Sequence, residues 1–597
     1  MDGPEHFSLY ETPEAFYVEP CDAHGARLPA AYLEIDRVTE EIQLTDPAVQ
    51  ALPAAQAQPP TPIRGLLGIV RLVAGPYLVV VTGAEQVVEN VAGARILKVT
   101  STELLPFSRR TLHLTERQNE HSRYFVELLK SVLALESFYY SVGVDLTTQS
   151  LQRLQDLPAA DRDVPLYERA DDRFFWNKYM AHELGDALQE AHKFVLVLTL
   201  GFVEVIRCSV RGRTFQLALV SRRSSKRAGP RLWRRGADRR GHAANFVETE
   251  QIVVYTEPEG VVRTTSFLQT RGSIPLDWAQ TPNLAWQPTP TLALPADRQH
   301  HLAVCASHLT EQLAIYGRPQ VIISLVNQTG RERPIGQQFK SIVEEVAMQG
   351  VVYDSFDFHK ECGNLNWDRL RVLVERMLPS LDNIGFFASR RQVDERLGER
   401  SQEGAFRTNC MDCLDRTNVV QKMLAHESLL RQLTFIGLLP EGATLDGRFD
   451  DQLNNLWADN GDALSKQYAG TGALKTDFTR FGKRTPLGAL ADGRNAMTRY
   501  VRNNFMDGAR QDGLDLFLGH YRVNAQALPD NLSPSGALQR GFAIGITFTF
   551  TMALLSQFAS ESLPLVLLWL ALTALLLFVA LKYYREELVD RPKLKTD

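Results

Sequence analysis

The chain has 597 residues, of which 44% are hydrophobic and 23% are charged. This length exceeds what one hydrophobic core usually supports, so we expect at least two folded units, and the composition excludes a largely disordered protein. The net charge of −5 identifies no partner, and six cysteines are too few for a disulfide scaffold. Residues 1–6 lack the basic and apolar segments of a secretory signal, so we expect the main body to lie in the cytosol.

Strand patterns dominate the N-terminal part of the chain. Residues 46–62 are rich in Ala, Pro and Gln and predict a loop. The apolar runs 69–73 and 77–82 flank an Ala-Gly-Pro turn and predict a β-hairpin. We therefore expect a β-rich subdomain over residues 1–185.

The following part alternates strand and helix patterns. Residues 202–206 and 215–220 flank a turn and predict a second hairpin, and residues 321–326 predict a fully buried strand. One helical face is formed by four apolar residues, Trp367, Leu370, Val374 and Met377. This alternation predicts a mixed α/β domain over residues 186–505.

The segment 407–418 reads RTNCMDCLDRTN and contains the candidate catalytic residues. Five residues separate Cys410 from Arg416, and Thr417 follows. This spacing allows a loop to curl around a phosphate group, with a helix starting just after it. The loop residues expected to line the phosphate are Met411, Cys413 and Leu414. The fold class predicted is therefore an α/β domain of the Cys-x5-Arg phosphatase type.

Each side chain of this loop suits one step of phosphoryl transfer. The helix end and the neighbouring guanidinium would lower the pKa of Cys410 from its ordinary value of about 8.5, giving a nucleophilic thiolate. Arg416 would hold two phosphate oxygens, and Thr417 would hydrogen-bond the sulfur. Asp412 and Asp415 are both candidates for the general acid that protonates the leaving alkoxide.

The pair Cys410 and Cys413 has two other interpretations. A Cys-x2-Cys can form half of a zinc site, with Cys362 and His359 as distant candidates for the other half, although no second half-site follows in the sequence. The pair could also form a reversible protective disulfide. The phosphatase interpretation needs neither a metal nor a cofactor, and we expect none.

A basic stretch, residues 207–240, carries twelve Lys and Arg residues against the single acid Asp238. We expect it to dock the catalytic domain on an anionic membrane surface. The residues expected to contact the substrate are Arg222, Arg223, Lys226 and Arg227. A solvated loop or a nucleic-acid patch are the alternatives; a membrane anchor in the same chain favours lipid over nucleic acid.

The C-terminal end predicts that anchor. Residues 541–558 and 563–581 contain no charge, and each is near the length of a bilayer span. Basic residues outside both spans place the tether, residues 506–540, and the tail, residues 582–597, on the cytosolic side. The alternative is a helical hairpin buried in a soluble core.

Several further segments extend the pattern beyond the loop. They are SVGVDLT (141–147), FFWNKYM (174–180), SRRSSKRAGPRLWRRG (221–236), NFVETEQ (245–251), RGSIPLDW (271–278), FDFHKEC (356–362), WADNGDALSKQYAGTGALKTDFTR (457–480) and NNFMDGARQD (503–512). Together with RTNCMDCLDRTN they resemble the Sac-domain phosphoinositide phosphatases over roughly residues 60–515. The resemblance implies an N-terminal β-rich subdomain packed on a phosphatase domain, Cys410 as nucleophile, Arg416 as phosphate binder and Asp412 or Asp415 as acid.

The tail refines this expectation. Lys593 and Lys595 resemble a dilysine signal that coatomer retrieves to the endoplasmic reticulum. With the two spans, they resemble the branch of the family in the endoplasmic reticulum and Golgi, which implies phosphatidylinositol 4-phosphate, with the 3-phosphate as a second substrate. The competing functions are a phosphatase for phosphoproteins or soluble inositol phosphates and a catalytically inactive lipid-binding scaffold or tether.

Overall fold

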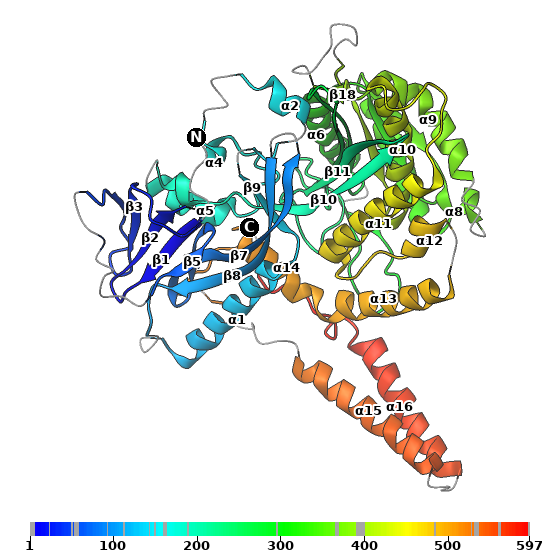
Figure 1. Cartoon of the computed structure of the whole chain (residues 1–597). Helices are drawn as coiled ribbons and strands as arrows, with labels where there is room; N and C mark the ends of the chain where they lie inside the picture. Colours follow the sequence, from blue (N-terminus) through cyan, green and yellow to red (C-terminus); the bar gives the residue numbers. More distant parts are fainter. Residues whose placement is uncertain are drawn as a thin grey trace.

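The structure is a computed structural model in which a folded body carries a projecting pair of long helices (Figure 1). It describes residues 6–22, 24–48, 52, 59–91, 94–110, 114–142, 144–148, 151–158, 164–187, 190–293, 297–363, 369–389, 400–482, 485–526, 528–529, 536–558 and 563–594.

A small antiparallel sheet forms the N-terminal edge of the body. Its strands, in the order β4-β3-β2-β1-β5, are β1 (His6–Glu11), β2 (Ala15–Cys21), β3 (Tyr32–Asp36), β4 (Ile42–Thr45) and β5 (Thr61–Ile63). Phe16 and Ile35 from this sheet share one buried core with Leu66 and Ile69 of the neighbouring sheet. The small sheet is thereby fixed to the rest of the body.

One large mixed sheet runs through the body. Its strand order is β17-β16-β19-β13-β12-β11-β10-β9-β8-β7-β6, and β18 pairs with β13. The bounds are β6 (Gly65–Leu72), β7 (Gly75–Val91), β8 (Ala94–Pro106), β9 (Phe138–Val142), β10 (Thr199–Val210), β11 (Arg213–Arg223), β12 (Val247–Thr256), β13 (Val262–Arg271), β16 (Gln320–Ser324), β17 (Val351–Ser355), β18 (Phe387–Ala388) and β19 (Ala405–Asn409). Pairs β6–β7 and β10–β11 confirm both predicted hairpins.

The large sheet joins the two predicted units. Tyr139 of β9 pairs with Thr199 of β10, which carries the sheet across the expected boundary. Residue 185 itself lies inside helix α5 (Lys178–Ala187).

Helices cover both faces of the parallel part, which is formed by β17, β16 and β19. Ile322 of β16 packs towards α6 (Arg298–Tyr316) and α7 (Arg333–Val346). Val321 and Ile323 point to the opposite face, against α9 (Leu370–Ile384), α10 (Asp415–Phe435) and α11 (Gly447–Ala469). Successive residues of a strand point to opposite faces, so this β16 pattern confirms the predicted buried strand. Helix α9 confirms the predicted helix, with Trp367 outside the described residues.

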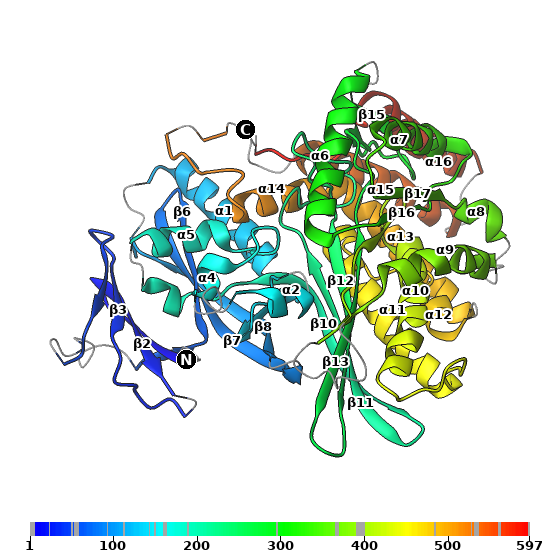
Figure 2. The same ribbon diagram turned by 90° about the horizontal axis from the view of Figure 1, so that it is seen from above.

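The other elements complete the body. They are α1 (Glu116–Leu133), α2 (Leu151–Asp156), α4 (Leu166–Arg169), η2 (Ala191–Phe194), β14 (Trp278–Ala279), β15 (Thr291–Leu292), η3 (Gly330–Glu332), α8 (Phe358–Glu361), α12 (Thr476–Phe481), α13 (Pro486–Phe505) and α14 (Asp507–Phe517). Figure 2 shows β10 to β13 extending as long hairpins beyond the body. Helix α14 falls in the expected tether, yet Leu514, Leu516 and Phe517 are buried in a core shared with α1. The first part of the tether is therefore part of the body.

The projecting helices are α15 (Gly536–Phe558) and α16 (Leu563–Tyr583). Both are long and apolar enough to cross a bilayer, and only 17% of the most apolar stretch of each helix is buried. This exposure argues against a hairpin enclosed in a soluble core, and it indicates association with a membrane. The turn between the spans, residues 559–562, lies outside the described residues.

After α16 the tail returns to the body. The Lys593 and Leu594 N–H groups donate to the carboxylate of Asp512 in α14, at 2.9 and 3.0 Å. Leu594 is buried in the core around α1 and α14. Lys595, the other half of the predicted dilysine signal, lies outside the described residues.

Candidate active site

The candidate catalytic loop, residues 410–414, connects the end of β19 to the start of α10. Strand β19 runs parallel to β16 and β13, so the loop lies at the carboxyl end of parallel strands, where α/β proteins form ligand sites. Helix α10 starts at Asp415 and directs its first free N–H groups towards the loop. The predicted helix is confirmed, but it was expected to begin just after Arg416 and instead begins at Asp415, so that Arg416 belongs to its first turn.

The Cys410 side chain is fully buried but has polar neighbours. The Cys413 N–H donates to the Cys410 Sγ at 3.1 Å, and the Thr417 hydroxyl donates to it at 3.5 Å. Burial by itself would raise the pKa of Cys410. The charge of Asp412 would also raise it. The side chain of Cys413, the charge of Arg416 and the hydroxyl of Thr417 overcome both effects and hold the pKa of Cys410 below its ordinary value. The sulfur is therefore disposed to ionise.

The loop geometry that directs the Cys413 N–H to the sulfur is unusual. Cys413 has a left-handed backbone, with φ at 54°. Its own thiol donates to the carbonyl oxygen of Gly272 at 2.9 Å, and burial raises its pKa well above the ordinary value. Cys413 thus acts as a neutral thiol that shapes the loop around Cys410.

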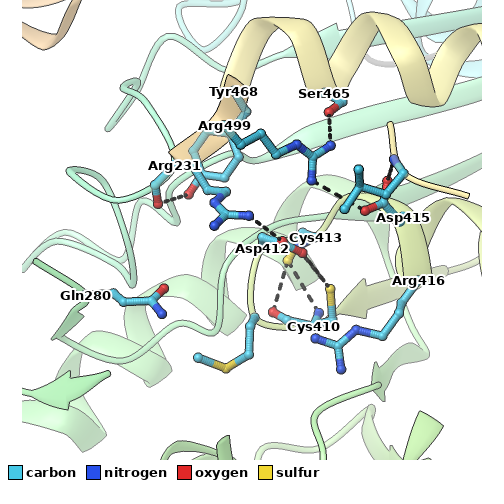
Figure 3. Close-up of polar contacts among 12 residues, drawn as sticks. Arg231, Gln280, Cys410, Asp412, Cys413, Asp415, Arg416, Ser465, Tyr468 and Arg499 are labelled. Atoms are coloured by element: carbon cyan, nitrogen blue, oxygen red, sulfur yellow. Dashed lines mark hydrogen bonds and ion pairs between the residues drawn. The ribbon is translucent and has the colours of Figure 1, made fainter. Parts of the chain in front are cut away.

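Asp412 lies beside the sulfur. Its Oδ1 is 3.4 Å from the Cys410 Sγ, and its Oδ2 is 3.5 Å from Arg231 (Figure 3). Burial opposes ionisation of Asp412, but four guanidinium groups, from Arg231, Arg235, Arg416 and Arg499, hold its pKa well below the ordinary range. Asp412 is therefore an anion that organises this arginine cluster.

Asp415 points to a different part of the site. Its Oδ1 accepts the N–H of Leu474 at 2.8 Å, and its Oδ2 is 3.7 Å from Arg499 (Figure 3). Burial raises the pKa of Asp415 to about 6, aided by the negative charge of Asp412 and opposed by Arg499. Of the two carboxyl groups, Asp415 is the one that can carry a proton near neutral pH.

Arg416 is held from the far side of the loop. Its guanidinium pairs with the carboxylate of Glu332 at 3.1 and 3.2 Å and donates to the carbonyl oxygen of Leu325 at 3.2 Å. The side chains of Arg416 and Glu332 are 23% and 21% exposed, and that of Asp412 is 22% exposed. These groups therefore keep contact with solvent, although the sulfur itself is buried.

The remaining loop residues have structural contacts. The Met411 carbonyl oxygen accepts a hydrogen bond from Arg235 at 2.6 Å, and the Asp412 carbonyl oxygen accepts one from Asn245 at 3.2 Å. Leu414 is buried and packs with Tyr468 of α11. These contacts anchor the loop at both ends.

The basic stretch 207–240 does not form one docking face, which corrects that prediction. Arg222 and Arg223 belong to the interior strand β11 and are 4% and 1% exposed. Arg222 pairs with Glu250, and Arg223 donates to the carbonyl oxygens of Gln467 and Gly229. Buried guanidinium groups need such partners, so these two side chains support the protein rather than contact a lipid surface.

The other basic residues of the stretch lie in separate parts of the structure. Arg227 donates to the carbonyl oxygen of Arg235, and Lys226 is half-buried. Arg211 and Arg213 are exposed at the β10–β11 turn, whereas Arg231 and Arg235 contact the candidate catalytic loop. The stretch therefore supplies the arginine cluster of the site in addition to surface charge.

Sequence reasoning missed five residues that contact the site: Arg231, Arg235, Asn245, Glu332 and Arg499. Arg231, Glu332 and Arg499 lie 181, 84 and 84 residues from their partners Asp412, Arg416 and Asp415. Arg231 lies inside the recognised segment 221–236 and Arg499 lies just before the segment 503–512, but Glu332 carried no local signal. Concerning zinc, the described residues contain no group of three or more His, Cys, Asp or Glu side chains able to hold a metal ion.

Comparisons with known proteins place these features in a family. The family model described as the SacI homology domain matches residues 64–363. The chain is 44% identical to phosphatidylinositol-3-phosphatase SAC1-B of Danio rerio over 520 residues, 87% of this chain and 85% of that protein. It is 40% identical to SAC1-A of the same organism, covering 99% and 98%. It is 38% identical to phosphatidylinositol-3-phosphatase SAC1 of Drosophila melanogaster, covering 99% and 97%.

Proposed function

Since the chain belongs to the Sac-domain family of phosphoinositide phosphatases, and so to the phosphoric monoester hydrolases, we propose that it removes the phosphate of phosphatidylinositol 4-phosphate through a phosphocysteine at Cys410. Phosphatidylinositol 3-phosphate is proposed as a second substrate, since the relatives are named for the 3-phosphate. The observation that carries the mechanism is the Cys410 sulfur, 3.1 Å from the N–H of Cys413 and close to the charge of Arg416.

The proposed reaction has two steps. In the first, the Cys410 thiolate forms a bond to phosphorus while the bond from phosphorus to the inositol oxygen breaks, and a carboxylic acid protonates that oxygen. In the second, water attacks the phosphocysteine, and the thiolate and inorganic phosphate are released. Arg416 stabilises the negative charge of the transferring group in both steps.

Two observations favour different residues as the acid. The short distance to the Cys410 sulfur, 3.4 Å, favours Asp412 as the acid. The protonation state favours Asp415, because burial raises its pKa to about 6. A general acid must be protonated, so with Asp415 in this role the rate falls as the pH rises above about 6. Asp415→Asn would then remove that pH limb and Asp412→Asn would keep it. The opposite result would assign the acid to Asp412.

The nucleophile is tested by Cys410→Ser in the full chain, purified in detergent and mixed with phosphatidylinositol 4-phosphate in micelles. We expect phosphate release without added metal to fall by at least about a thousandfold, since serine at this position is not ionised. Cys208→Ser, a buried cysteine of β10, is the matched control and should keep its activity. An active Cys410→Ser protein would refute the mechanism, and an inactive parent protein would favour a lipid-binding scaffold.

We also propose residence in the endoplasmic reticulum membrane with cycling to the Golgi, through coatomer binding to Lys593 and Lys595. The two apolar helices support the membrane part. The N–H of Lys593 is bound to Asp512, so the tail must leave α14 before coatomer can read an extended signal. Replacing both lysines by Ala should move the protein from the reticulum to the Golgi in cells, and an unchanged distribution would refute the signal.

A further inference from the structure

Helix α13 carries an apolar stripe on its outward face. The stripe consists of Leu487, Leu490, Met497, Val501 and Phe505, which are 80%, 73%, 56%, 42% and 38% exposed. Steps of three, seven, four and four residues keep these side chains on one side of a helix. Large apolar side chains aligned in this way indicate a surface that is covered when the protein works.

The opposite face of α13 is polar and buried. Arg499 and Asn503 lie on this face and are 3% and 4% exposed. An ordinary surface helix buries its apolar side and exposes its polar side. Helix α13 has the reverse arrangement, so its apolar residues do not contribute to the core of the body.

A tryptophan lies next to this helix. Trp286 is 56% exposed and stacks on Tyr500 of α13, with ring centroids 5.4 Å apart. Arg494 is exposed on α13 between Leu490 and Met497. Aromatic and basic side chains beside apolar ones are typical of surfaces that lie at the boundary between lipid headgroups and acyl chains.

The chain itself brings a bilayer to α13. Figure 1 shows α15 and α16 projecting from the side of the body on which α13 lies. The segment that leaves α16 after Tyr583 reaches α13 within seven residues, where the Asp590 N–H donates to the carbonyl oxygen of Asn504 at 2.7 Å. The last turn of α13 is thus tied to the end of the second span. The bilayer that the hairpin crosses is therefore the surface closest to the stripe and the one expected to cover it.

We propose that the α13 stripe and Trp286 insert into the surface of the bilayer that the hairpin spans. This inference rests on the proposed function, because it gives the orientation in which the catalytic loop meets a lipid headgroup. The buried side of α13 reaches the site: Arg499 donates to Thr471 and Ser465 at 2.8 Å and pairs with Asp415. Insertion of one face therefore positions the active site through the other.

The first test compares two forms of the same substrate. The full chain is reconstituted in phosphatidylcholine vesicles containing either long-chain phosphatidylinositol 4-phosphate in the bilayer or a water-soluble short-chain analogue. For Leu490→Asp with Val501→Asp we expect about tenfold slower hydrolysis of the bilayer substrate, equivalent to about 1.4 kcal/mol, and an unchanged rate on the soluble analogue. The matched control, Val38→Asp with Val372→Asp, changes exposed valines elsewhere on the body and should alter neither rate.

The second test needs no activity. Brominated lipids in the same vesicles should quench Trp286, so Trp286→Phe should lose part of the quenched fluorescence of the parent protein. Equal bilayer rates in the stripe variant, or no quenching assigned to Trp286, would overturn the proposal and leave the stripe to a protein partner. A parent protein inactive on both substrates would instead refute the proposed function, while quenching of Trp286 would still support insertion.

Discussion

The ion pair between Glu332 and Arg416 offers a sharp test of the phosphate-binding role of Arg416. The guanidinium faces the carboxylate at 3.1 and 3.2 Å, so part of its positive charge is neutralised before a phosphate arrives. Glu332→Gln keeps the size of the side chain and one acceptor oxygen, but it removes the charge and replaces the second acceptor oxygen by an NH2 group, so one of the two contacts with Arg416 is lost. We expect the variant to bind phosphate more tightly.

The magnitude follows from the geometry. A phosphate held by Arg416 would lie roughly 6 Å from Glu332, and two unit charges at that distance repel by about 3 kcal/mol at an effective dielectric constant of about 20. Both side chains are about one-fifth exposed, at 21% and 23%, so solvent and salt screen the interaction. We expect a net effect of about 1 kcal/mol, or about fivefold in affinity.

The assay is inhibition of the full chain by inorganic phosphate and by vanadate, with phosphatidylinositol 4-phosphate in detergent micelles as substrate. Glu345→Gln is the control. Glu345 lies in α7, the helix that begins directly after Glu332, but it pairs with Arg298, away from the loop. The inhibition constants should fall about fivefold for Glu332→Gln at low salt, less at high salt, and stay constant for the control. Weaker inhibition of Glu332→Gln would show that Glu332 orients Arg416 for binding, and would refute this reasoning.

Three further predictions concern stability. Burial lowers the pKa of His426, but hydrogen bonds and charge from Asp450 and Glu427 raise it to about 9 from 6.5. Charged His426 thus stabilises the fold fully below about pH 6.5 and loses this effect towards pH 9. Compared with the parent protein, His426→Gln should have a lower melting temperature at pH 6 and the same melting temperature near pH 9. Equal melting temperatures at pH 6 would contradict this. Leu594→Asp should free the tail and speed its removal by protease, whereas unchanged cleavage would mean that the tail is not held by its buried leucine. Thr573→Val should weaken the α15–α16 pair by about 0.6 kcal/mol, measured by unfolding in detergent, because it removes the 2.8 Å hydrogen bond to Thr549; no change would show that packing alone holds the pair.

The sequence alone determined the features that depend on neighbours along the chain. The spacing from Cys410 to Arg416 specifies a loop because a strand end, a tight turn and a helix start are local structures. The same holds for the hairpins β6–β7 and β10–β11 and for the two uncharged spans, whose length and composition suffice to indicate them.

Only the tertiary structure decided which distant groups meet. Glu332 reaches Arg416 and Arg499 reaches Asp415 because parallel strands and their covering helices bring these residues to one edge of the sheet. A count of basic residues could not separate the buried Arg222 and Arg223 from the exposed Arg211, since pairing within the sheet decides which side chains lose contact with water. The outward position of the apolar stripe on α13 likewise could not be predicted from the sequence. An apolar pattern shows which residues share a face of a helix, but not whether that face meets the core.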